Sequence, residues 1–206
     1  MNDPLGRLAV RRKTGTEPFH VAGRSCDFTL LDFWRWSASD LLSNAMRGVL
    51  AEYIVAKALG ADDGARTEWD SCDLRTPDGL RIEVKCAAYL QSWAQTKVSS
   101  PSFNIASRLA WDAATNTYAQ EPCRSADLYV FALLHHRDKA TVDPLDLSQW
   151  TFYALPAAVL NERCPRQKTI RLAPLLKLDP IHTDHAGLYA TVEQMARTSD
   201  RQPAIE

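Results

Sequence analysis

Residues 70–87, DSCDLRTPDGLRIEVKCA, are the stretch of the chain that most strongly predicts a structure. Within it, residues 76–79 read Thr-Pro-Asp-Gly, which is typical of a tight turn. Proline sets φ for the first central position of a type I turn, and glycine accepts the left-handed conformation that follows. We therefore predict two strands, at roughly 67–75 and 80–88, joined by a three-residue loop with a glycine bulge.

The length of this loop predicts the register of the hairpin. If residues 77–79 form the loop, Thr76 pairs with Leu80 and Asp73 lies opposite Glu83, on one face of the sheet. That face then carries the polar side chains Ser71, Asp73, Arg75, Arg81, Glu83 and Lys85. The other face carries the apolar side chains Cys72, Leu74, Leu80, Ile82 and Val84. A slip by one residue would mix the two sets, so their separation supports this register.

The facing acids of the hairpin predict a metal site. Two carboxylates with Cβ atoms roughly 5 Å apart repel each other, and a divalent cation between them removes the conflict. Hard oxygen ligands suit Mg²⁺ or Mn²⁺. Lys85 follows Glu83 by two residues and points the same way, where an ammonium can position a metal-bound water. The alternative is a solvent-exposed face whose charged side chains only pair with one another.

An amphipathic helix is expected before the hairpin, from Asp40 to Leu59. Ser39 is a suitable N-cap, and Gly60 stands where a C-terminal glycine belongs. Glu52 lies at the edge of the apolar stripe of this helix, where a carboxylate is costly unless it is paired or metal-bound. Alternatively, Glu52 is a boundary residue that reaches water or Lys57.

The segments after the hairpin complete an α/β pattern. Residues 126–134, ADLYVFALL, are an uninterrupted apolar run typical of a strand buried on both faces. Further elements are expected as short strands at 102–105, 149–155 and 168–172, a short helix opened by Pro156, and a terminal helix over 188–197. This order predicts an α/β sandwich with a mixed central sheet of four or more strands flanked by helices.

Length and composition indicate a soluble protein with one domain. The chain has 206 residues, of which 46% are hydrophobic and 24% charged, enough for one sizeable core. We expect residues 28–206 to form this domain, with residues 28–36 packed onto its body. Residues 1–27 are expected to be a loosely ordered arm, because Gly, Pro and Arg occur there without periodicity.

Cysteine usage and hydropathy bear on the compartment. The five cysteines are an odd number without a C-x-x-C pair, which argues against a disulfide framework and a zinc ribbon and indicates a reducing cytoplasm. Nothing in the chain reaches the roughly 20 uninterrupted apolar residues that a membrane helix needs.

Charge is distributed unevenly along the chain. The net charge of −1 gives no overall attraction for nucleic acid. However, residues 61–100 hold seven acids and five bases, whereas residues 163–177 hold five bases and no acid. An acidic centre with basic flanks suits a protein that holds a cation and a polyanion, although a basic run is equally explained as a solvated surface.

A helix with Glu52, a strand with Asp73, a short turn and a strand with Glu83-Val84-Lys85 resemble the PD-(D/E)XK, or restriction-endonuclease-like, nuclease superfamily. The resemblance covers roughly residues 40–135, which would form the core of the domain. One departure is that Cys72 stands where the proline of the motif's name would be.

This resemblance implies the roles of the site residues. Mg²⁺ (or Mn²⁺) would be held by Asp73, Glu83 and the backbone carbonyl of Val84. Lys85 would orient or activate the attacking water, and Glu52 would act in the outer shell or on a second metal. Hydrolysis of the phosphodiester would leave a 5′-phosphate.

The resulting hypothesis is a metal-dependent nuclease that cuts DNA rather than RNA, and cutting both strands with one site per chain would favour a homodimer. Weaker substrate-binding candidates are Gln91, Gln95, Arg166, Lys168 and Arg171, for which surface packing is the alternative. Two other functions stay open. One is a module on the same fold that binds nucleic acid or protein without cutting it, and the other is a hydrolase acting on a different substrate.

Overall fold

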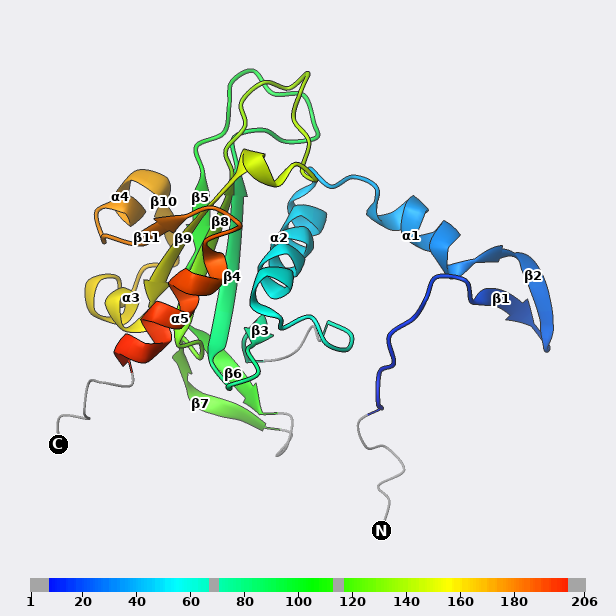
Figure 1. Cartoon of the computed structure of the whole chain (residues 1–206), viewed down its shortest axis with the longest axis horizontal. Helices are drawn as coiled ribbons and strands as arrows, with labels where there is room; N and C mark the ends of the chain where they lie inside the picture. Colours follow the sequence, from blue (N-terminus) through cyan, green and yellow to red (C-terminus); the bar gives the residue numbers. More distant parts are fainter. Residues whose placement is uncertain (1–7, 67–70, 113–116, 200–206) are drawn as a thin grey trace, which may run out of the picture.

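The structure is a computed structural model in which residues 8–66, 71–112 and 117–199 are described. Its centre is a five-stranded sheet (Figure 1). In sheet order the strands are β11 (Ile181–Thr183), β9 (Trp150–Pro156), β8 (Leu128–Leu134), β4 (Arg81–Ala88) and β3 (Leu74–Arg75). β4 and β8 are parallel, and the other neighbours are antiparallel. The predicted α/β class with a mixed central sheet is confirmed.

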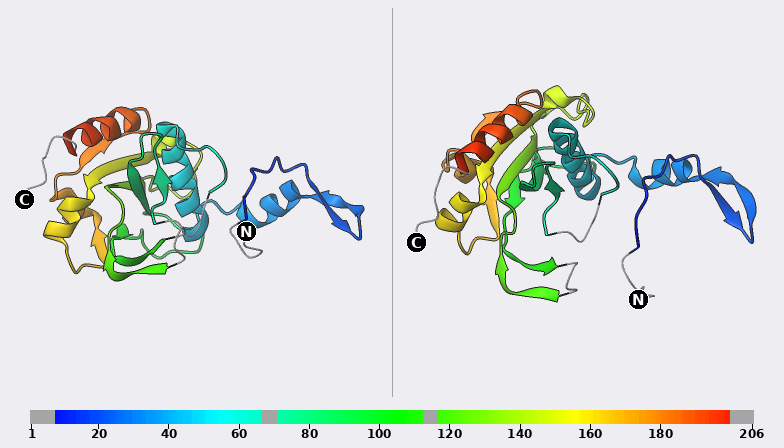
Figure 2. Two further views of the ribbon diagram at one scale, coloured as in Figure 1. Left: turned by 90° about the horizontal axis from the view of Figure 1, so that it is seen from below. Right: turned by 60° about the horizontal axis from the view of Figure 1, so that its bottom comes forward.

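Layers of structure cover both faces of this sheet (Figure 2). One face packs against α2 (Asn44–Leu59) and α5 (Leu188–Ser199). The other packs against α3 (Ala157–Arg163), α4 (Leu172–Leu176) and a two-stranded sheet of β5 (Ser102–Asn104) and β10 (Thr169–Arg171). A 3₁₀ turn, η1 (Leu147–Gln149), precedes β9. Because β8 lies in the middle of the sheet, all seven of its residues are buried, as its apolar run predicts.

The hairpin of β3 and β4 has the predicted register. Leu74 pairs with Ile82, and the Thr76 amide donates to the Leu80 carbonyl at 3.0 Å. Gly79 has a φ of 93°, the left-handed conformation that the turn requires. Asp73 stands immediately before β3, and its Oδ2 accepts from the Val84 amide of β4 at 2.8 Å.

The alternation of faces fails at the start of the hairpin. Residues 67–70, the first part of the predicted strand, lie outside the described residues, and β3 itself has two residues. Cys72, predicted on the face of Leu74 and Ile82, is instead buried among Ala87 and Tyr129 on the opposite face. The reason is that residues 71–73 form bends rather than a strand, so side chains there do not alternate.

The helix that carries Glu52 begins later than predicted. α2 starts at Asn44, and its N-cap is Ser43, whose hydroxyl accepts from the Met46 amide at 3.3 Å. Ser39, the predicted N-cap, follows the preceding helix and donates its hydroxyl to the Arg35 carbonyl. The predicted C-terminus is confirmed, because Gly60 adopts the left-handed conformation with φ 64°.

The N-terminal segment contains regular structure where none is predicted. β1 (Pro18–Val21) and β2 (Arg24–Thr29) form a hairpin that leads into α1 (Leu30–Ala38). Figure 1 shows these elements reaching away from the rest of the molecule. Residues 28–36, which were expected to pack onto the body, are exposed or half-buried throughout, and Trp34 is the one among them that lines a cavity together with residues of α2.

A second hairpin, of β6 (Arg108–Asp112) and β7 (Thr117–Cys123), projects beside the lower end of the sheet (Figure 1). All five cysteines are free thiols, in agreement with the odd count. Within the described ranges, no helix is long and apolar enough to cross a membrane.

Candidate active site

Three of the predicted site residues meet at the edge of the sheet. The Lys85 ammonium lies 3.6 Å from Asp73 Oδ2 and also forms an ion pair with Glu83. The three side chains are mostly buried, with exposed fractions of 21% for Asp73 and 15% for both Glu83 and Lys85. Both acids therefore lie on one side of β4 and share one ammonium group, which is the arrangement that the hairpin register predicts.

The backbone of Val84 faces this cluster. Along β4 and the residue before it, every second backbone faces the strand β3. Leu80 and Ile82 face it, and Val84 is the next residue that points in the same direction. Since β3 ends before reaching Val84, the Asp73 carboxylate takes the place of a strand partner and accepts from the Val84 amide at 2.8 Å. The amide and carbonyl of one strand residue point toward the same neighbour, so the Val84 carbonyl also points toward the edge where Asp73 lies.

Burial and like charge perturb the acids. Desolvation, and then the neighbouring Asp73 carboxylate, raise the pKa of Glu83, and Lys85 partly offsets this rise. Repulsion of this kind is typical of two carboxylates that share one site. A cation held between them would lower the energy of their ionised forms.

Two residues that the sequence did not single out surround Glu83. Tyr129 of β8 is directly opposite Glu83 in the parallel ladder and is 3% exposed. Burial, and then the charge of Glu83, raise the pKa of Tyr129 to about 12. Arg108, at the start of β6, lies close enough to lower the pKa of Glu83. The single hydroxyl group in the apolar run of residues 128–134 was the only sequence signal for Tyr129, and Arg108 had none.

Glu52 does not contact the three-residue cluster directly. Its carboxylate is held by the guanidinium of Arg66, with Nη2 of Arg66 3.1 Å from Oε1 of Glu52 and a second contact through Nε. The paired carboxylate that the sequence predicts is observed, but the partner is Arg66 rather than Lys57, which pairs with Asp62.

A cavity of about 660 Å³ joins Glu52 to the site. Asp73 and Glu52 both line it, and aromatic side chains are supplied by Trp34 and Tyr53. Five basic residues also line this cavity, namely Arg11, Arg12, Lys13, Arg66 and Arg75. Four acids line the same cavity, namely Glu52, Asp62, Asp63 and Asp73, and two of the bases pair with them, Arg66 with Glu52 and Arg12 with Asp62.

Gln91 and Gln95 brace the loop after β4. Gln91 is 6% exposed, and its side-chain oxygen accepts from Arg47 at 3.1 Å. Gln95 accepts from the Gln91 amide at 2.7 Å and donates to the Tyr89 carbonyl at 3.2 Å. Both amide groups are thus engaged within the protein.

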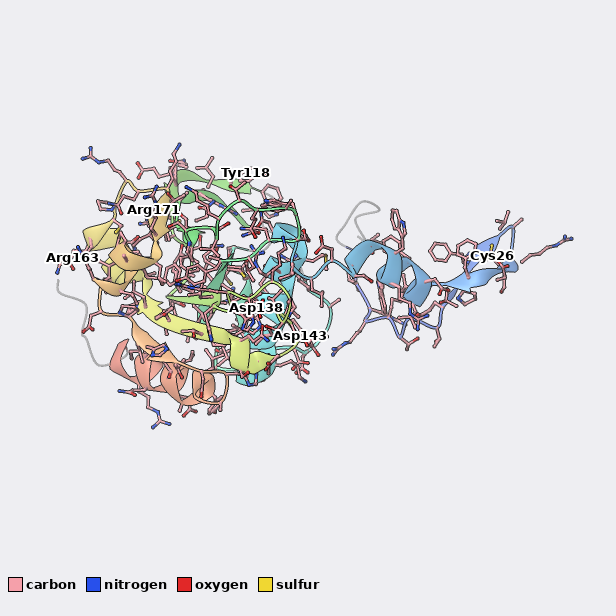
Figure 3. All side chains as sticks on the ribbon, turned by 90° about the horizontal axis from the view of Figure 1, so that it is seen from above. Cys26, Tyr118, Asp138, Asp143, Arg163 and Arg171 are labelled. Atoms are coloured by element: carbon pink, nitrogen blue, oxygen red, sulfur yellow. The ribbon has the colours of Figure 1, made fainter. Side chains whose placement is uncertain are left out.

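The basic candidates Arg166, Lys168 and Arg171 lie in a different layer from the acids. They are exposed on β10 and the loop before it, and β10 pairs with β5 rather than with the central sheet. Figure 3 shows Arg163 and Arg171 on the part of the molecule away from Cys26, which marks the N-terminal hairpin. The structure does not bring these cations to the Asp73 cluster.

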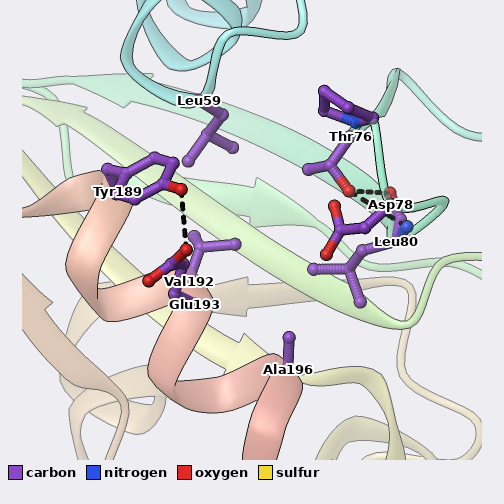
Figure 4. Close-up of a pocket in the computed structure, with 9 residues that line it drawn as sticks. Leu59, Thr76, Asp78, Leu80, Tyr189, Val192, Glu193 and Ala196 are labelled. Carbon is purple, nitrogen blue, oxygen red and sulfur yellow. Dashed lines mark hydrogen bonds between the residues drawn. The ribbon is translucent and has the colours of Figure 1, made fainter.

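Another pocket, of about 360 Å³, lies between the β3–β4 turn and α5 (Figure 4). Its walls include Leu59, Asp78 and Tyr189, and the Tyr189 hydroxyl donates to Glu193 at 2.6 Å. This pocket is bordered by α5, which covers the face of the sheet opposite Tyr129.

Metal ligation here would need backbone and water oxygens. In the parts of the chain that the structure describes, no three His, Cys, Asp or Glu side chains are grouped to hold a metal ion. Asp73 and Glu83 supply two carboxylates, and the Val84 carbonyl supplies a third oxygen. Such a set of hard oxygen donors suits Mg²⁺ or Mn²⁺, which usually keep several waters.

Comparison with known proteins gives the family. No curated protein matches the chain. The family model described as bacteriophage T4 endonuclease IV matches residues 29–173, which include α1, α2 and the whole Asp73 cluster. This match spans more than half of the 206 residues. The chain belongs to the bacteriophage T4 endonuclease IV family, and so to a family of nucleases.

Proposed function

We propose that this protein is a metal-dependent DNA endonuclease of the PD-(D/E)XK type. The observation that carries the proposal is the ion pairing of Lys85 with both Asp73 and Glu83 at the open edge of β4. Membership of an endonuclease family supports the nuclease activity. The pair of carboxylates beside an ammonium group supports the reaction class, and the free thiols suit a reducing cytoplasm.

Asp73, Glu83 and the Val84 carbonyl would hold Mg²⁺ or Mn²⁺. The fit rests on two mostly buried carboxylates that share the Lys85 ammonium, and on the Val84 backbone, whose amide donates to Asp73. When bound, the cation would polarise a phosphate oxygen and lower the pKa of a coordinated water. Glu52 would act in the outer shell or on a second metal, since it lines the same cavity as Asp73.

Lys85 has two tasks in this scheme. Its ammonium can orient the attacking water, because it lies within 3.6 Å of a carboxylate oxygen. It also stabilises the negative charge that develops on the phosphate, in a half-buried place where such interactions are stronger than in water. The Asp73 carboxylate is held in position by the Val84 amide, which fixes one oxygen and leaves the other available.

The substrate would approach through the cavity of Glu52 and Asp73. Arg11, Lys13 and Arg75 in its lining can bind backbone phosphates, which dominate nucleic-acid affinity and make it depend on salt. Arg108, beside Glu83, is positioned to contact a phosphate next to the one that is cut.

The test is a cleavage assay on labelled DNA with Mg²⁺, with Mn²⁺ and with a chelator. We expect cleavage only with metal, its loss in Asp73→Ala and Glu83→Ala, and a fall of roughly 10²–10⁴-fold in Lys85→Met. Glu162→Ala is the matched control, because Glu162 is 75% exposed on α3 and its removal should leave the rate unchanged.

Circular dichroism of each variant checks that the chain still folds. Cleavage by Asp73→Ala at the parent rate would remove this residue from the site, and full activity in chelator would exclude metal dependence. Calorimetric titration with Mg²⁺ separates an enzyme from a binding module, since the enzyme should bind the ion and lose that binding in Asp73→Ala.

A further inference from the structure

The N-terminal elements form a surface that the rest of the chain does not cover. Unlike the arm of residues 1–27 that the sequence predicts, the arm of the structure is residues 18–38, which comprise β1, β2 and α1. Every residue of the arm is exposed or half-buried. Figures 1 and 2 show it reaching outward from the body in all three views. Its hydrogen bonds outside the hairpin run to the chain just before it, from the Leu30 amide to the Glu17 carbonyl and from Leu31 to Gly15.

The arm is rich in exposed apolar side chains. With their exposed fractions these are Phe19 (40%), Val21 (71%), Phe28 (46%), Leu31 (40%), Phe33 (45%), Trp34 (37%) and Trp36 (84%). A fully buried aromatic side chain covers roughly 150–250 Å², so this set offers on the order of 800 Å². That is about the area that one partner contributes to a stable interface. It is spread over two sides of α1, because Leu31 and Trp34 lie next to Gly15, whereas Phe33 and Trp36 lie together on the opposite side.

The charge of the arm favours a protein partner over a nucleic acid. Its two bases, Arg24 and Arg35, are balanced by two acids, Asp27 and Asp32. Arg35 is also paired with Asp32 at 3.7 Å. A surface that binds phosphates would carry an excess of cations, whereas a nearly neutral, aromatic surface is typical of the buried centre of a protein interface.

The local structure of the arm requires a covering surface. A two-stranded hairpin alone is marginally stable in water, and an isolated helix shorter than ~12–15 residues is too. α1 has nine residues. Every copy of the chain carries one arm, so a second copy can supply the apolar surface that covers it. In a symmetric dimer, each arm covers the arm of the other copy.

We propose that the arm is a dimerisation element, through which two copies of this chain pack their exposed aromatic residues against each other. The interface is isologous, with the same residues contributed from both copies. It also reaches the active site, because Trp34 lines the cavity of Glu52 and Asp73. The adjoining segment lies against the body, where Arg12 donates to the Asp62 carbonyl at 3.3 Å. Dimerisation therefore holds one wall of that cavity in place.

The test measures the mass of the full chain by sedimentation equilibrium over a range of concentrations. We expect a dimer that dissociates on dilution, and Trp36→Glu should be monomeric at concentrations where the parent is dimeric. Leu145→Glu is the matched control, since Leu145 is 65% exposed in the loop before η1 and its substitution should leave the dimer intact. Trp36 is 84% exposed, so its loss should not unfold the chain, as circular dichroism can verify.

Three results would overturn the proposal. The first is a parent chain that is monomeric throughout the micromolar range. The second is a dimer that Trp36→Glu leaves unchanged. The third is a monomeric parent whose DNA binding is weakened by Trp36→Glu, which would make the arm a nucleic-acid surface. None of these depends on whether the Asp73 cluster cuts DNA, so failure here is distinguishable from failure of the proposed function.

Discussion

The hairpins β1–β2 and β3–β4 have turns of different length, two residues in the first and three in the second, and opposite surroundings. Each turn contains a glycine with positive φ, 80° for Gly23 and 93° for Gly79. β4 pairs with β8 along its other edge, so Ile82 is fully buried, whereas Val21 of β1 is 71% exposed. Turn chemistry therefore produces a hairpin in both places, but only the packing partner decides whether the hairpin belongs to the core.

The largest difference between the two hairpins should appear on truncating a branched side chain in each. Ile82→Ala leaves a cavity between α2 and the sheet, and we expect a loss of about 2–5 kcal/mol in the free energy of unfolding. Val21→Ala should change it by less than ~0.5 kcal/mol. Hydrogen exchange of the β8 amides measures unfolding of the body in both variants. Similar losses would mean that the arm unfolds together with the core.

Substituting the two turn glycines should give a smaller difference in the free energy of unfolding than truncating Ile82 and Val21. Gly79→Ala forces an alanine into the left-handed region, and we expect it to destabilise the body by about 1–2 kcal/mol. Gly23→Ala imposes the same strain on the arm and should leave unfolding of the body unchanged. Urea denaturation followed by circular dichroism compares the two, and Gly48→Ala is the control. Because nothing lies within 4 Å of a Cβ added at Gly48 in α2, that change should stabilise the helix by about 0.5–1 kcal/mol.

The smallest difference expected between the two regions is in how their stability depends on pH. The ion pair concerned should contribute less than about 1 kcal/mol to the free energy of unfolding. Arg81, whose Nε is 3.1 Å from Asp127, holds the pKa of Asp127 below its ordinary value of 3.8. A lowered carboxylate pKa stabilises the folded chain above that value, and the contribution is lost as the pH falls through the folded-state pKa.

The unfolding temperature of Asp127→Asn should therefore be lower than that of the parent above about pH 4, and the two temperatures should converge in acid. In the arm, Asp32 accepts from the Thr29 amide at 2.8 Å, which lowers its pKa in the same way. Asp32→Asn should nevertheless leave the unfolding of the body unchanged. A pH-independent difference between parent and Asp127→Asn would show that the ion pair with Arg81 does not act through its charge.

Much of the site could be predicted because it depends on a turn. The loop at residues 77–79 sets the register of β3 and β4, and the short strand β3 then brings the bend at Asp73 close to Glu83 and Lys85. The predicted roles of these residues, and of Glu52, stay predictions until metal binding and cleavage are measured. Tyr129 could not be placed beside Glu83, because that pairing joins strands more than forty residues apart.

Other parts of the molecule had competing local solutions. Ser39 and Ser43 are both suitable helix caps, and the choice between them depends on where α1 ends and where α2 meets the sheet. Glu52 had Lys57 five residues further along the helix, but Arg66 provides two contacts from a loop. A bidentate guanidinium pair is stronger than a pair with one flexible ammonium, which accounts for the observed partner.

The sequence by itself determined the features that depend on a few neighbouring residues. These are the turn at Gly79, the helix end at Gly60, the buried strand of residues 128–134 and the alignment of the hairpin acids, since backbone dihedrals and side-chain alternation are local properties. Only the tertiary structure decided which strand lies beside β4, which face buries Cys72, which cation holds Glu52 and that the arm stays uncovered. Those outcomes depend on contacts between distant segments, for which many pairings have similar local energies.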